Sequence, residues 1–125
     1  MAGEKILVID DEETICILLE QILRAAGYSV ETASSGEEAI EKAKATTYHL
    51  MFVDSVMPGM DANQVCKVVR AISPRTSLIF MTGKFVGTVA QREAEFQAAG
   101  GKVYALYKPL SREEILEAAR NALAT

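Results

Sequence analysis

The sequence predicts an α/β fold in which a parallel β-sheet carries helices on both of its faces. Short apolar runs alternate along the whole chain with longer segments whose apolar residues recur at helical spacing. Several of the runs are continuously aliphatic, which is typical of strands buried on both faces of a parallel sheet. Because five such strands alternate with five helices, we expect each helix to connect parallel neighbours.

The first strand is the aliphatic run 6–9. The next helix has its apolar residues at i, i+3, i+4, i+7 and i+8 within 15–23, which places them on one helix face. A second strand over 28–33 alternates between apolar and polar residues, so one of its sides is less buried. Ser35 and Glu38 then form a capping-box pattern at the start of a second helix that runs to about 45.

The third strand, 50–53, is again a continuous apolar run. A third helix carries apolar residues at helical spacing within 65–72, and Pro74 bars its continuation. The fourth strand is 78–81, and a less regular helix follows it and ends at glycines 100–101.

The chain ends with a fifth strand and a fifth helix. The strand covers 103–106, and the helix opens with a second capping-box pattern, Ser111 and Glu114. Neither an internal repeat nor a linker interrupts this order, so we expect one domain over 1–125.

Composition excludes several classes of function. The formal net charge is −4, which argues against a nucleic-acid-binding surface, since binding to phosphates requires clustered Lys and Arg. No run of apolar residues is long enough to span a membrane or to act as a signal peptide, so we expect a cytoplasmic protein. Cys16 and Cys66 fall in helical segments without a metal-binding spacing and are expected to be small buried residues. His49 is expected to be a hydrogen-bonded or solvent-facing turn residue.

Polar side chains stand where four of the predicted strands end. Asp10 and Asp11 follow the first strand, Asp54 the third and Thr82 the fourth, while Lys108 follows the fifth. Because the carboxyl ends of parallel strands meet at one edge of the sheet, we expect these five residues to converge in one crevice. Taken alone, an Asp pair after a strand is more often a helix N-cap than a metal site, and only its companions favour metal binding.

Such a constellation is suited to binding a transferring phosphoryl group. Two carboxylates about 4 Å apart repel each other by roughly 4 kcal/mol at an effective dielectric constant of about 20, so three of them need a compensating cation. Oxygen ligands without His or Cys select a hard ion, and Mg²⁺ fits best. Lys108 and Thr82 could bind phosphoryl oxygens, which would leave one carboxylate as the nucleophile.

Four motifs resemble those of the receiver domain of two-component response regulators: DD at 10–11, DSVMPGMD at 54–61, MTG at 81–83 and KP at 108–109. The resemblance covers essentially the whole chain in the right order. It implies a flavodoxin-like doubly wound sheet with the strand order 2-1-3-4-5. It also implies a signalling protein that catalyses only its own phosphorylation and dephosphorylation.

The resemblance implies a role for each site residue. Asp54 would accept a phosphoryl group from a sensor histidine kinase or a phosphotransfer protein. Asp11 would bind Mg²⁺ directly, Asp10 largely through a bound water, and the Val56 carbonyl would be a further ligand of the ion.

Two more implied roles concern the phosphoryl group. Lys108 would contact it, aimed by a cis peptide bond to Pro109, and Thr82 would shift toward it. Phosphorylation would then change the binding of a downstream effector protein, and the domain would be a monomer or a phosphorylation-dependent dimer that binds neither nucleic acid nor membrane.

Three features depart from the family pattern. Ala105 stands where an aromatic residue is usual, the stretch 82–108 is longer by about one helical turn, and Ala62 replaces a common glycine. The first two keep an alternative open: a pseudo-receiver that acts as a phosphorylation-independent interaction domain. A Mg²⁺-dependent phosphohydrolase is a third interpretation, but Ser55 and Val56 offer no second acid beside the nucleophile.

Overall fold

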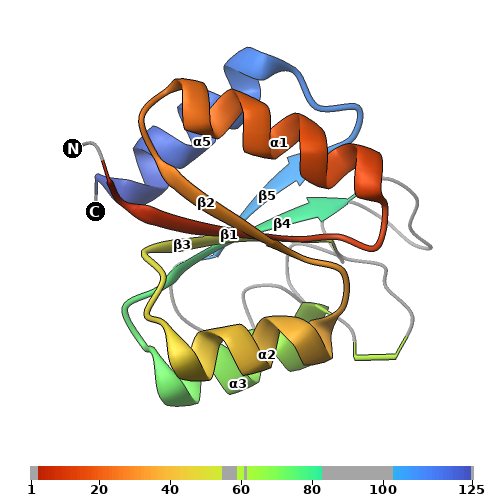
Figure 1. Cartoon of the computed structure of the whole chain (residues 1–125), viewed down its shortest axis with the longest axis vertical. Helices are drawn as coiled ribbons and strands as arrows, with labels where there is room; N and C mark the ends of the chain where they lie inside the picture. Colours follow the sequence, from red (N-terminus) through yellow and green to blue (C-terminus); the bar gives the residue numbers. More distant parts are fainter. Residues whose placement is uncertain (1–2, 55–58, 61, 83–102, 125) are drawn as a thin grey trace.

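The computed structural model describes residues 3–54, 59–60, 62–82 and 103–124, and the side chains of 103–105 and 107 fall outside this description. Its centre is a five-stranded parallel sheet with the order β2-β1-β3-β4-β5, as predicted (Figure 1). The strands are β1 (Lys5–Ile9), β2 (Ser29–Ala33), β3 (Leu50–Asp54), β4 (Ser77–Thr82) and β5 (Val103–Tyr107).

Helices cover both faces of the sheet. They are α1 (Glu13–Ala25), α2 (Gly36–Ala45), α3 (Ala62–Ile72) and α5 (Arg112–Leu123). Helices α1 and α5 lie on one face, while α2 and α3 lie on the other (Figure 1). The helix expected between β4 and β5 falls within 83–102, outside the described residues.

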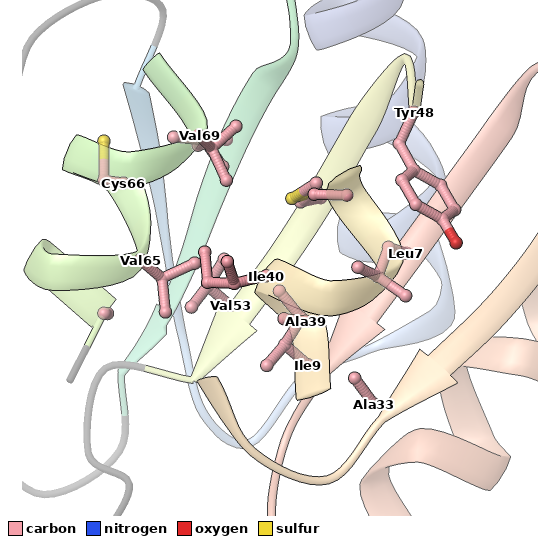
Figure 2. Packing of buried hydrophobic residues seen from close by; sticks show 14 of the residues in the cluster. Leu7, Ile9, Ala33, Ala39, Ile40, Tyr48, Val53, Val65, Cys66 and Val69 are labelled. Atoms are coloured by element: carbon pink, nitrogen blue, oxygen red, sulfur yellow. The ribbon is translucent and has the colours of Figure 1, made fainter. Parts of the chain in front are cut away.

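The central strands separate two hydrophobic layers. In β1, Ile6 and Val8 pack with residues of α1 and α5, whereas Leu7 and Ile9 pack with residues of α2 and α3. Figure 2 shows the second layer, where Val65 of α3 lies beside residues of the strands and of α2. All four of these β1 side chains are fully buried, which explains why the run in the sequence is continuous rather than alternating.

The two predicted capping boxes have different outcomes. At α5 the box is complete, because the Ser111 hydroxyl accepts from the Glu114 N–H and the Glu114 carboxylate accepts from the Ser111 N–H. At α2 Ser35 caps the helix as predicted, but the Glu38 carboxylate accepts from the backbone and hydroxyl of Ser34 instead. At α2, therefore, only the bond made by the glutamate side chain is displaced by one residue.

Two cationic side chains bind the backbone of β2. Arg24 at the end of α1 donates to the Val30 carbonyl at 2.9 Å, and Lys42 of α2 donates to the Thr32 carbonyl at 2.8 Å. The alternate positions of the strand face β1, as shown by the bond from the Asp10 N–H to the Ala33 carbonyl. Both bonded carbonyls therefore point away from the neighbouring strand.

Three residues without a predicted catalytic role, Cys16, Cys66 and His49, have the predicted environments. Cys16 and Cys66 are buried free thiols. The Nδ1 atom of His49 accepts a hydrogen bond from the Lys5 N–H at 3.0 Å, so this histidine is a hydrogen-bonded turn residue. Across the part of the chain that the structure describes, no helix has the length and apolar character needed to cross a membrane.

Candidate functional site

The strand ends bring the predicted residues to one edge of the sheet. Asp10 follows β1, Asp54 closes β3, Thr82 closes β4 and Lys108 follows β5. The N–H of Lys108 donates to the Thr82 carbonyl at 2.8 Å, so the last bond between β4 and β5 fixes the backbone of the lysine. The peptide bond between Lys108 and Pro109 is cis, as the resemblance implied.

Lys108 joins three carboxylates. Its Nζ lies 3.2 Å from Oδ2 of Asp10, 3.5 Å from Oδ1 of Asp54 and 3.6 Å from Oε1 of Glu12. The side chains of Asp10, Asp54 and Lys108 are 0%, 7% and 17% exposed, so these ion pairs lie in a largely dry environment. One ammonium group faces three carboxylates, which leaves the cluster net negative.

The pKa values of the central pair reflect this environment. Burial raises the pKa of Asp10 above its ordinary value, and it outweighs the Glu12 N–H and the Lys108 charge, which both lower it. Burial lowers the pKa of Lys108, but the combined attraction of Asp10, Asp54 and Glu12 outweighs it and raises that pKa overall. Lys108 therefore stays protonated at neutral pH. At Asp10, the Lys108 charge and the Glu12 N–H do not fully offset the cost of burying the carboxylate.

Glu12 is a site residue that the sequence analysis missed. Oxygen atoms of Asp10, Glu12 and Asp54 lie within 4.8 Å of one another, and these three form the one acidic group of that size found among the described residues. Asp11 is exposed and lies outside this group. The signal in the sequence is the acidic run 10–13, of which only the first two residues directly follow the predicted strand. Val56 falls outside the described residues.

Thr82 contributes a buried hydroxyl group at the same edge. The residue is 0% exposed, and its Oγ1 has no hydrogen-bond partner within the described part of the chain. A buried hydroxyl without a partner costs about 1–3 kcal/mol, so this oxygen is suited to receiving an additional ligand atom. Ala105 lies in β5, but its side chain and those of Tyr104 and Tyr107 are outside the description.

The donor set fits a hard divalent cation. Three carboxylates with neither His nor Cys among them select ions such as Mg²⁺, and the net negative charge of the cluster would be offset by binding one. The same edge carries an ammonium group and the Thr82 hydroxyl, which has no partner among the described residues; both groups are suited to anionic oxygens.

Comparison with known proteins identifies the family. The family model described as the response regulator receiver domain matches residues 6–120. The chain belongs to this family. As a receiver domain, it has the phosphoacceptor signalling role of two-component systems.

Relatives and solved structures agree with this assignment. The transcriptional regulatory protein ResD of Bacillus subtilis is 38% identical over 112 residues, which cover 90% of this chain and 45% of ResD. Protein PilG of Pseudomonas aeruginosa is 34% identical, and the match covers 93% of this chain and 84% of PilG. The structure of the chemotaxis protein CheY4 of Vibrio cholerae matches with a TM-score of 0.87 at 30% identity, over 98% of this receiver domain and 100% of CheY4.

The receiver domain is shorter than many of its relatives. It spans 34% of the alkaline phosphatase synthesis transcriptional regulatory protein PhoP of Bacillus subtilis, to which it is 42% identical over 82 residues. It also spans less than half of ResD.

Proposed function

We propose that Asp54 of this receiver domain accepts a phosphoryl group from the phosphohistidine of a sensor histidine kinase or a phosphotransfer protein, with Mg²⁺ as cofactor. The observation that carries the proposal is the contact of Lys108 with both Asp10 and Asp54 at the carboxyl edge of the sheet. An ammonium group beside the nucleophile can stabilise the phosphoryl oxygens as charge develops on them.

The chain's own residues then have distinct roles. An Asp54 carboxylate oxygen attacks phosphorus, a new P–O bond forms, and the P–N bond to the donor imidazole breaks with its electron pair leaving on nitrogen. Lys108 binds a phosphoryl oxygen, and the buried Thr82 hydroxyl donates to another. Asp10, Asp11 and the Val56 carbonyl are the proposed cation ligands beside Asp54, and the bound cation supplies positive charge to the phosphoryl oxygens.

Phosphorylation would be read by a downstream effector protein. A phosphoryl group on Asp54 would attract Lys108 away from Asp10 and would accept a hydrogen bond from the Thr82 hydroxyl. Because Thr82 closes β4, this new bond would shift the end of that strand. The proposed protein is a monomer that can dimerise after phosphorylation. It catalyses only its own phosphorylation and dephosphorylation.

The test is the intact mass of the protein after incubation with acetyl phosphate and Mg²⁺. We expect a gain of one phosphoryl group that is lost when Mg²⁺ is chelated and in Asp54→Asn, a variant that keeps the shape of the side chain. Glu41→Gln, at an exposed position of α2, is the matched control and should be phosphorylated like the wild type. Absence of any gain in the wild type would overturn the proposal in favour of a pseudo-receiver.

A further inference from the structure

Glu12 occupies an unusual place at the start of α1. It is the N-cap residue of the helix, and its carbonyl accepts from the N–H groups of Ile15 and Cys16. N-cap positions favour Ser, Thr, Asp and Asn, because their short side chains reach the first free N–H groups. The Glu12 side chain makes no such capping bond.

The side chain is directed to the carboxylate cluster instead. Its Oε1 lies 3.6 Å from Nζ of Lys108, and its carboxylate belongs to the group of three whose oxygens lie within 4.8 Å of one another. Repulsion from Asp10 and Asp54 opposes this position. The Glu12 side chain is 60% exposed, so it could instead extend into solvent. The backbone also ties Glu12 to the site, since its N–H donates to Oδ1 of Asp10 at 2.9 Å.

We propose that Glu12 helps to hold the divalent cation, as a further carboxylate beside the proposed ligands Asp10, Asp11 and Asp54. The inference rests on the proposed function, and it adds to the site a residue that the family motifs do not include. A divalent ion would attract each of the three carboxylates and so offset the repulsion among them. The exposed end of Glu12 would also leave room for bound water between it and the ion.

The experiment is a calorimetric titration of the whole protein with Mg²⁺. We expect Glu12→Gln to bind Mg²⁺ about tenfold more weakly than the wild type, the low end for residues around a metal, because this side chain is largely exposed. Glu13→Gln is the matched control, since it removes the same charge from the next residue, which is exposed in the first turn of α1. We expect its affinity to remain within about twofold of the wild type.

A second measurement tests whether the environment of the Glu12 carboxylate changes when Mg²⁺ binds. The side-chain carboxyl carbon of Glu12, assigned in the ¹³C spectrum by its loss in Glu12→Gln, should shift on saturation with Mg²⁺, while that of Glu13 should not. The shift itself is measured on the wild-type protein, and the variant serves only to assign the signal.

The possible outcomes are distinct. Equal Mg²⁺ affinity in Glu12→Gln and the wild type, equal weakening in Glu13→Gln, or an unmoved Glu12 signal would each overturn the inference. If Asp54 were still phosphorylated in such a case, the proposed function would stand without it. A wild-type protein that neither binds Mg²⁺ nor gains a phosphoryl group would overturn both.

Discussion

The Nζ atom of Lys108 lies 3.2 Å from Oδ2 of Asp10, although 98 residues separate the two in the sequence. Asp10 follows the interior strand β1, while Lys108 follows the edge strand β5. The same ammonium group reaches Asp54 at the end of β3. One side chain therefore connects the ends of three strands, and its removal should destabilise the carboxyl edge of the sheet.

Lys108→Met should destabilise the protein in the absence of Mg²⁺. The change leaves Asp10 buried without its cation, and breaking a buried pair from one side costs about 3–5 kcal/mol. We expect the lower end, about 3 kcal/mol, because the raised pKa of Asp10 makes its protonation easier. Urea unfolding at neutral pH measures the difference. Lys44→Met, which removes an exposed ion pair of α2, is the control and should stay within about 0.5 kcal/mol of the wild type.

Asp54→Asn should have the opposite effect in the same buffer. It removes one of three mutually repelling carboxylates and leaves Asp10 to pair with Lys108, so we expect a gain of about 1 kcal/mol in the free energy of unfolding. Mg²⁺ should raise the melting temperature of the wild type and have little effect on this variant. A variant that is less stable than the wild type without Mg²⁺ would show that the Lys108 pair outweighs the repulsion.

Gly36→Ala should loosen the packing of α2 against α3. A Cβ at this position would lie 2.9 Å from Cγ2 of Val65 and 3.0 Å from the carbonyl oxygen of Met60, so a helix would have to move. Overpacking of this kind costs about 1–3 kcal/mol. In urea unfolding, Val65→Ala should partly relieve the clash, so that the double variant is less destabilised than the sum of the two single changes. Strict additivity would contradict the contact.

Cys16 should be unreactive toward thiol reagents in the folded protein. Burial, followed by the charge of Asp10, raises the pKa of its thiol from 9.0 to about 11. At pH 8 the thiolate fraction is then about 0.1%, against roughly 10% for an unperturbed thiol. Ellman's reagent should therefore react slowly with the native protein and quickly in denaturant. Burial also raises the pKa of the Cys66 thiol, so this second cysteine should react slowly as well. Cys66→Ser, which leaves Cys16 as the single thiol, should therefore show the same slow reaction in the native protein.

The same shift has a consequence for stability. The folded state keeps the proton on Cys16 more tightly than the unfolded chain does, so this contribution is fully present below pH 9. It declines as the pH rises from 9 toward 11, where the folded thiol also ionises. Cys16→Ala should flatten the decrease of stability with pH in that window, as followed by unfolding at several alkaline pH values.

The positions that could be predicted from sequence are those fixed by strand periodicity. Asp10, Asp54, Thr82 and Lys108 each end a strand, and parallel strands end at one edge whatever their side chains are. Glu12 could not be found this way, because its direction depends on the charge of a lysine supplied from the far end of the chain. The shifted box at α2 has a similar cause: a Ser34 hydroxyl and N–H compete for the carboxylate, and spacing alone cannot rank two adjacent serines.

The bonds from Arg24 and Lys42 to β2 bear on how copies of the protein behave toward one another. Strand β2 forms one border of the sheet, and a border strand with free carbonyls is a template for pairing with a foreign strand. Here the acceptors of Val30 and Thr32 already hold cationic side chains, which a newcomer would have to displace before its own N–H groups could bind. The fold thus leaves a sheet margin uncovered while protecting it against strand-by-strand aggregation.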